Sequence, residues 1–262
     1  MLITLSPSKG QDFDTPTPSS IYSIPDQLDD SQLLIKEAKK LDIKDVRELM
    51  DVSENISILN VERFNTWSMP FNTENAKAAL FAFKGDVYSG IQKEKYSDGD
   101  LNYAQDHLRI LSGLYGALRP MDLIQPYRLE MKTKLDNPRG TNLYQFWDER
   151  ITEKLNETLE NHQEKVLVNL ASNEYFKSVK PKKLDARLLN INFKETKGDK
   201  TRVIAIFAKR ARGMMTDFIL RNRIEHAEDI KDFGVGGYQF SAQESTENNW
   251  VFSRPQPAPA KK

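Results

Sequence analysis

The sequence predicts a single α+β domain over residues 1–254, in which helices surround a mixed β-sheet. Some predicted strands follow one another directly and others are separated by helices, so both parallel and antiparallel neighbours are expected. No segment repeats with a period of about 20–50 residues, which argues against a solenoid. Residues 255–262 have no apolar face to bury and are expected to form a flexible tail.

The first half of the chain predicts a short strand followed by a helical layer. Asp30 and Ser31 can cap the first helix, whose leucines recur at helical spacing. The expected elements are a strand over 2–5, a turn over 6–10, a loop over 12–25, and helices over 32–41, 43–50 and 54–67. Residues 78–91 fit a strand followed by a helix, or one helix interrupted at Gly85, and periodicity does not decide between them.

The second half alternates strands with helices. The most regular helical pattern lies over residues 142–159, where six large apolar side chains follow the 3.6-residue period and Asn142 can act as the cap. The expected elements are an apolar run at 108–111, a turn over 112–120, strands over 125–131, 165–170, 187–193 and 201–207, helices over 142–159, 172–179 and 208–223, and a closing hairpin of 236–241 and 250–254.

Composition excludes several classes of protein. The chain contains no cysteine, so disulfides, thiolate nucleophiles and iron–sulfur ligation are absent. His107, His162 and His226 are too far apart in sequence to suggest a shared metal, and we expect neither a metal nor a cofactor. No apolar run approaches the roughly 20 residues of a membrane span, and residues 1–20 lack a secretory signal pattern. A cytoplasmic protein is expected.

Charge is distributed unevenly along the chain. The formal net charge is zero, but residues 176–223 hold fourteen basic and four acidic residues, a surplus of ten positive charges that the other residues balance. A basic face on an otherwise acidic body would attract a polyanion. The alternative is a set of solvated lysines spread over several surfaces.

Lys209, Arg210 and Arg212 are expected in the first turn of the helix over 208–223. Cations there oppose the helix dipole, so an anion such as phosphate would offset their cost. Alternatively, these side chains extend into solvent or pair with carboxylates. A second candidate is Gly113-Leu114-Tyr115-Gly116, whose glycines resemble a helix-hairpin-helix, although a plain tight turn at a sheet edge fits equally well.

The segment Ser6-Pro7-Ser8-Lys9 directly follows a strand, where α/β sheets commonly bind ligands, although it lacks the spacing of a P-loop. Lys9 could hold a phosphate, Asp86 or Glu174 could act as a base, and each could equally be an ordinary surface or capping residue. Polar residues that could converge in one enzyme pocket are Ser6, Lys9, Asp86, Arg119, Tyr127, Arg128, Asn173, Glu174 and Lys209.

Six motifs in the same order along the chain resemble the YaaA family of bacterial peroxide-stress proteins. They are Leu-Ser-Pro-Ser-Lys at 5–9, Gly-Asp-Val-Tyr at 85–88, Leu-Ser-Gly-Leu-Tyr-Gly at 111–116 with Leu-Arg-Pro-Met-Asp-Leu-Ile-Gln-Pro-Tyr-Arg-Leu-Glu-Met at 118–131, Asn-Leu-Tyr-Gln-Phe-Trp at 142–147, Asn-Leu-Ala-Ser-Asn-Glu-Tyr-Phe-Lys at 169–177, and Ala-Lys-Arg-Ala-Arg-Gly-Met-Met at 208–215.

The resemblance implies one α+β domain with a basic cleft and a helix-hairpin-helix-like element, sequence-independent binding to DNA (duplex and branched, with the Holliday junction as one form to test), and protection of DNA from iron and peroxide. The DNA-binding residues expected on this basis are Gly113, Gly116, Arg119, Lys177, Lys180, Lys182, Lys183, Lys209, Arg210 and Arg212. Two other classes stay open: an enzyme with a phosphate- or nucleotide-binding pocket, and a protein whose basic face binds an acidic partner. The sequence does not determine the oligomeric state.

Overall fold

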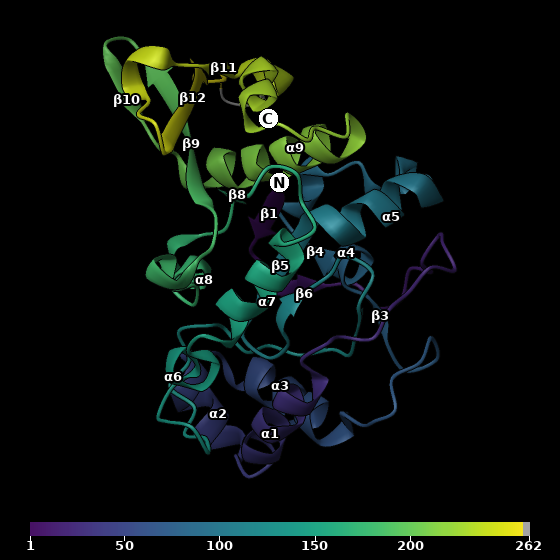
Figure 1. The fold of residues 1–262 in the computed structure, drawn as a ribbon. Helices are drawn as coiled ribbons and strands as arrows, with labels where there is room; N and C mark the ends of the chain where they lie inside the picture. Colours follow the sequence, from purple (N-terminus) through teal and green to yellow (C-terminus); the bar gives the residue numbers. More distant parts are fainter. Residues whose placement is uncertain (259–262) are drawn as a thin grey trace.

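The computed structural model describes residues 1–258 and shows one main mixed sheet with helices around it (Figure 1). The strands are β1 (Leu2–Leu5), β2 (Gly10–Gln11), β3 (Lys77–Ala78), β4 (Phe83–Lys84), β5 (Leu108–Ser112), β6 (Gly116–Leu118), β7 (Leu123–Ile124), β8 (Val166–Asn169), β9 (Arg187–Lys197), β10 (Lys200–Arg202), β11 (Gln239–Phe240) and β12 (Asn249–Pro255). The α-helices are α1 (Leu28–Ala38), α2 (Ile43–Met50), α3 (Glu54–Thr66), α4 (Ala79–Ala82), α5 (Asp98–His107), α6 (Leu143–Trp147), α7 (Arg150–Leu159), α8 (Asn173–Phe176) and α9 (Ala205–Arg221).

The main sheet has eight strands in the order β11-β12-β9-β8-β1-β5-β6, with β10 paired to β9. Its five central strands, β12, β9, β8, β1 and β5, run parallel, whereas β6, β10 and β11 pair antiparallel. The mixed sheet is therefore confirmed. The parallel centre makes the class mixed α/β rather than α+β, because parallel strands need crossover connections and these contain the helices.

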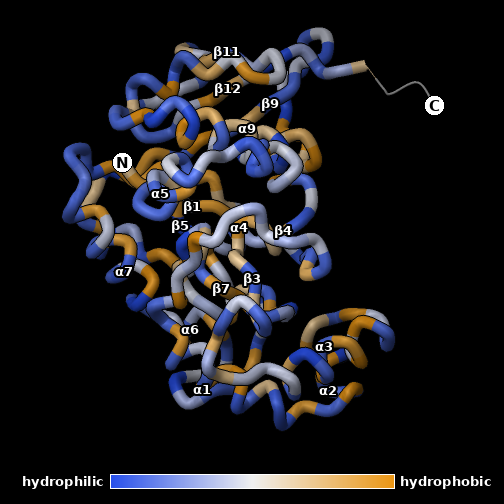
Figure 2. The backbone as a smooth tube through the Cα atoms, turned by 90° about the vertical axis from the view of Figure 1, so that its right-hand side faces the viewer, coloured by the Kyte–Doolittle hydropathy of each residue, from blue (hydrophilic) through white to orange (hydrophobic). Residues whose placement is uncertain are grey.

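The core is built around β1, all four residues of which are buried. Leu2, Ile3 and Leu5 are fully buried, and α5 and α7 both contact the strand. Hydrophobic residues follow the central strands in Figure 2, which also shows α1–α3 at one end of the molecule and β9, β11 and β12 at the other. Burial of apolar side chains in this interior is the main stabilising term of the fold.

The helical layer expected in the first half is confirmed at α1, α2 and α3. Asp42 caps α2 and forms a reciprocal capping box with Asp45. The first helix begins at Leu28, so Asp30 and Ser31 lie inside it and the expected cap is wrong. The undecided residues 78–91 form parts of two short strands, α4 and a 3₁₀ turn over Tyr88–Gly90, because these pieces pair with distant segments that periodicity does not reveal.

Three expected elements differ in the second half. The helix over 142–159 is divided into α6 and α7 at Asp148, which adopts a positive φ of 41°. The strand over 125–131 is absent, since pairing in this region is confined to β7 at Leu123–Ile124. The strand over 201–207 shortens to β10, because α9 already begins at Ala205.

The helix-hairpin-helix expected around Gly113 and Gly116 is wrong, and the structure supports the alternative of a tight turn. Residues 113–115 connect β5 to β6, which pair antiparallel, so the element is strand–turn–strand. Every residue from 108 to 118 is buried. A Cβ atom on Gly113 would come within 2.3 Å of the Leu129 carbonyl oxygen, so glycine serves close packing here and not an exposed loop.

The predicted tail begins inside the sheet. Strand β12 extends to Pro255, and the Gln256 amide donates a hydrogen bond to the Thr196 carbonyl. Residues 259–262 lie outside the described part of the chain, so the flexibility of the tail stays a prediction. Within residues 1–258, no helix is long and apolar enough to cross a membrane.

Two of the three histidines meet in space although they are distant in sequence. The rings of His107 and His162 lie 4.6 Å apart between centroids, and Tyr103 stacks on the other side of His107 at 3.9 Å. Burial lowers the pKa of both histidines, that of His162 to about 4. The lowered pKa values favour the neutral form of both rings, which form an aromatic contact. Among the described residues, no group of three or more His, Asp and Glu side chains could hold a metal ion.

Acid should therefore destabilise the protein between about pH 6.5 and pH 4. The unfolded chain binds a proton on His162 near pH 6.5, whereas the folded chain binds it only near pH 4, so stability falls as pH decreases through this window. Urea unfolding at pH 7 and pH 4.5 should show a smaller acid loss for His162→Asn than for the wild type. His226→Asn, at a side chain 65% exposed, is the control and should behave as wild type.

The backbone of α9 packs directly against the 3₁₀ turn over Tyr88–Gly90. A Cβ atom on Gly213 would lie 1.8 Å from the Val87 carbonyl oxygen, and one on Gly90 would lie 2.4 Å from the Arg210 carbonyl oxygen. Two glycines facing each other thus allow a contact that no side chain permits.

Gly213→Ala should reduce the free energy of unfolding by about 2 kcal/mol, because the added methyl group overpacks a backbone contact. Chemical denaturation measures the change. Gly234→Ala is the matched control, since a Cβ atom there meets nothing within 4 Å. Equal stability of the two variants would contradict the close contact.

Candidate functional site

A cleft of about 780 Å³ opens at the carboxyl ends of β1 and β8. These neighbouring strands are parallel, and their connections lead in opposite directions: the chain leaves β1 to reach β5 on one side and leaves β8 to reach β9 on the other. Such a topological switch point is where open α/β sheets bind ligands. The expectation of a site directly after the first strand agrees with the position of this cleft.

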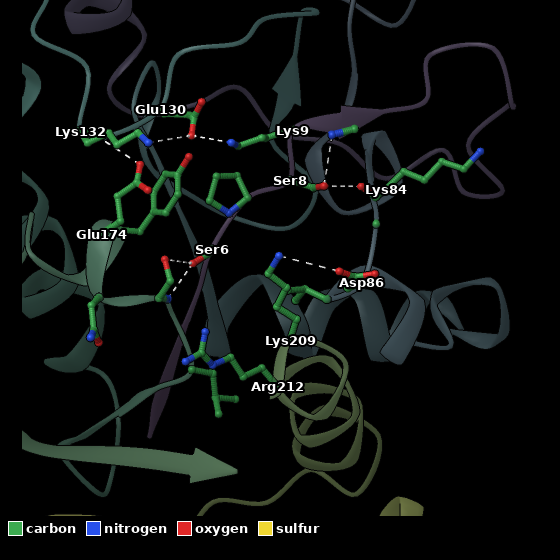
Figure 3. A pocket seen from close by; sticks show the side chains of 18 residues that line it. Ser6, Ser8, Lys9, Lys84, Asp86, Glu130, Lys132, Glu174, Lys209 and Arg212 are labelled. Carbon is green, nitrogen blue, oxygen red and sulfur yellow. Dashed lines mark hydrogen bonds and ion pairs between the residues drawn. The ribbon is translucent and has the colours of Figure 1, made fainter. Parts of the chain in front are cut away.

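Two serines tie the loops after β1 and β8 together. The Ser172 amide donates to Ser6 Oγ at 2.8 Å, and the two hydroxyls are 3.2 Å apart. Ser6 is buried and forms the floor between α8 and α9 (Figure 3). The floor of the cleft is therefore held by hydrogen bonds between segments 166 residues apart.

Glu130 is the cleft carboxylate with the most cations around it. Lys9 Nζ lies 2.8 Å from its carboxylate, Arg128 lies 3.4 Å away and Lys132 lies 3.9 Å away. Burial acts to raise the pKa of Glu130, but the hydrogen bond from Lys9 and the charges of Lys9, Arg128 and Lys132 outweigh it and lower the pKa. Glu130 is thus held as a carboxylate that positions Lys9 (Figure 3).

On the opposite wall, Lys209 Nζ lies 3.8 Å from Asp86, a long ion pair between exposed side chains. Ser8 Oγ donates to the Lys84 carbonyl, which brings the loop after β1 against β4. Gly85 follows with a φ of 135°, a conformation that favours glycine, and it turns Asp86 toward the cleft (Figure 3).

Arg212 lines the cleft without a partner. Within residues 1–258 its guanidinium has no ion pair and no hydrogen bond, although burial lowers its pKa. A partly buried guanidinium without a counter-ion is costly unless a ligand supplies the negative charge. This residue is the strongest indication that the cleft binds an anion.

Lys209, Arg210 and Arg212 do not lie in the first turn of their helix, contrary to the expectation from the sequence. Since α9 begins at Ala205, these residues lie in its second and third turns and not in the first. The free amides and the positive end of the helix dipole therefore lie before these three residues and do not favour an anion beside them. Lys209 and Arg212 nevertheless line the cleft, while Arg210 is exposed.

Six of the nine residues expected in an enzyme pocket line the cleft, and Arg119, Tyr127 and Arg128 do not. The six are Ser6, Lys9, Asp86, Asn173, Glu174 and Lys209. Tyr127 is instead buried and shares a hydrogen bond with Ser112, and Arg128 reaches the site only through Glu130.

The other residues expected to bind DNA differ in the groups that they contact in the structure. Arg119 is bound to Asp26, Asp122 and the Ile24 carbonyl, which gives it a structural role in this fold. Lys180 and Lys183 lie 3.7 and 3.6 Å from the carboxylates of Asp148 and Glu149, respectively. Lys177 lies over the Tyr144 ring, and Lys182 is exposed.

Sequence reasoning missed Glu130, Lys132, Lys84 and Ser172 as cleft residues. Glu130 belongs to an irregular segment that was expected to be a strand, so no local pattern placed it beside Lys9. The available signal was its position in the long polar motif at 118–131. The cleft as a whole is lined by five cations (Lys9, Lys84, Lys132, Lys209, Arg212) and three carboxylates (Asp86, Glu130, Glu174).

Comparison with known proteins gives a consistent result over nearly the whole chain. A family model described as peroxide stress protein YaaA matches residues 1–244. UPF0246 proteins from Aliivibrio fischeri strain MJ11 and from strain ATCC 700601 / ES114 are each 52% identical over 254 residues, which is 97% of this chain and 98% of each relative.

Lys9→Met should raise the pKa of Glu130, because it removes the closest cation while the burial of the carboxylate remains. Carboxyl ¹³C NMR titration of the wild type and the variant measures the change. Lys84→Met serves as the control: it removes another cleft cation that forms no ion pair with Glu130 in the described structure. An unchanged pKa in Lys9→Met would show that the 2.8 Å ion pair does not persist in solution.

Proposed function

We propose that this chain, which belongs to the peroxide stress protein YaaA family, binds DNA without sequence preference. It would bind duplex and branched DNA and so limit DNA damage under peroxide stress. The observation that supports anion binding is the unpartnered Arg212 in the switch-point cleft. Phosphate is the anion that DNA offers at every nucleotide.

The cations beside the cleft support the same proposal. Lys209 and Arg212 line the cleft from α9, and Lys209 is held only by the long ion pair to Asp86. Arg210 is an exposed cation of the same helix. Contacts from such side chains to phosphate carry no base information, which fits sequence-independent binding. Ion-paired residues such as Lys183 contribute less, since a phosphate must compete with their carboxylate partners.

Protection from peroxide would act at the DNA and not through a thiol sensor. The chain contains no cysteine, so thiol oxidation cannot report peroxide. We propose that the bound protein shields DNA or assists its repair.

A second candidate function is an enzyme that acts on a phosphorylated small molecule. The volume of the cleft, about 780 Å³, is in the range of roughly 300–1,000 Å³ typical of small-ligand pockets. Its switch-point position and its carboxylates beside cations also suit catalysis on a small substrate.

Replacement of Lys209, Arg210 and Arg212 by alanine should weaken duplex binding and leave the fold intact. Wild-type affinity should fall with salt at a log–log slope of about −4 to −5, given about five phosphate contacts, and the triple variant should lose about three units of that slope. Fluorescence anisotropy on a duplex and a Holliday junction, with thermal melts, provides the measurements.

The matched control replaces Lys36, Lys44 and Arg47, three exposed cations of α1 and α2, by alanine and should retain wild-type binding. If the wild type and the α9 triple variant bind the duplex equally well, the DNA-binding face lies elsewhere, and the second candidate function, an enzyme, is favoured. Absence of duplex binding by the wild type would refute the proposal.

A further inference from the structure

Two partly buried charges of opposite sign lie on different walls of the switch-point cleft without an ion pair. Arg212, on α9, has no ionic partner within residues 1–258. Glu174, on α8, likewise forms no ion pair in the described chain and accepts only a long hydrogen bond of 3.4 Å from the Lys132 amide. The remaining carboxylates, Asp86 and Glu130, are already paired with lysines.

A duplex backbone alone does not match this arrangement. Phosphates suit Arg212, but a carboxylate beside them is repulsive. Glu174 instead suits a donor of hydrogen bonds, such as the exocyclic amino group of adenine or cytosine, which carboxylates accept in nucleic-acid recognition. The two free groups together fit a ligand with an anion at one end and amino hydrogens at the other.

The rest of the cleft fits the body of such a ligand. Leu170 is buried, and Pro7, Val87 and Tyr175 are partly buried, so apolar surface lies between the charged walls. Apolar and aromatic side chains of this kind accept the face of a base in a pocket. A cleft of about 780 Å³ is large enough for one nucleotide. A paired duplex is too wide to enter it, since its major groove alone is about 12 Å wide, and must remain at the rim.

We infer that the cleft binds a single nucleoside 5′-phosphate unit, with the phosphate at Arg212 and the amino group of the base at Glu174. The inference builds on the proposed function, because a DNA strand at the rim carries such units. A free nucleotide offers the same chemistry, and the experiment distinguishes the two sources.

Isothermal titration calorimetry with deoxyadenosine 5′-phosphate, 2-deoxyribose 5-phosphate and deoxyadenosine tests both ends of the ligand. The complete nucleotide should bind the wild type at least about 10-fold more tightly than either fragment, since each charged hydrogen bond contributes about tenfold. Arg212→Ala should weaken the nucleotide about 10-fold and leave deoxyadenosine unchanged. Glu174→Gln should weaken the nucleotide and leave 2-deoxyribose 5-phosphate unchanged.

Lys36→Ala and Glu48→Gln, two exposed positions on α1 and α2, are the matched charge controls and should bind as wild type. Thermal melts establish that all variants fold. The inference is overturned if no nucleotide binds at millimolar concentration, or if Arg212→Ala and Glu174→Gln bind it as tightly as the wild type.

Titration of duplex DNA into protein saturated with deoxyadenosine 5′-phosphate identifies the source. A reduced duplex affinity would mean that a nucleotide of the strand uses the cleft, and an unchanged duplex affinity would assign the cleft to the free nucleotide. Nucleotide binding by a protein that binds no DNA would refute the proposed function and retain this inference.

Discussion

The fold depends on the parallel pairing of β1 with β5 on one side and β8 on the other. The four buried residues of β1 form backbone hydrogen bonds with these two neighbouring strands. A short apolar strand can therefore occupy the centre of the sheet. Because the chain enters β1 first and adds neighbours on both sides later, the end of β1 becomes the place where connections diverge. The cleft is a geometric result of that order.

The charges around the cleft come from five segments that only the tertiary structure brings together. Lys9 follows β1, Asp86 follows β4, Glu130 lies in irregular chain, Glu174 lies on α8, and Arg212 lies on α9. Most of these charges neutralise one another, so the net local charge says little about the ligand. The informative groups are the ones left without partners, because their desolvation is compensated only when something binds.

Local patterns in the sequence were sufficient for some features and insufficient for others. The apolar run of β1 and the periodic leucines of α1 were visible, and general rules for sheets predicted the position of a cleft after the first strand. Asp148, by contrast, adopts a positive φ and interrupts a regular helical pattern. The neighbouring residues in the sequence do not predict this interruption. The glycines at 113 and 116 fitted either a helix-hairpin-helix or a tight turn. Their role in the structure is to admit the Leu129 carbonyl and the Gln27 side chain, contacts that the local sequence does not reveal.

The facing glycines of α9 and the turn at Tyr88–Gly90 have a further consequence for recognition. Gly213 is adjacent to Arg212, so the contact that immobilises the glycine also fixes the backbone from which the guanidinium extends. A ligand then meets a preorganised cation and loses less conformational entropy than it would on a mobile loop. In the proposed anion site, two residues without side chains would thus help to hold the cation in place.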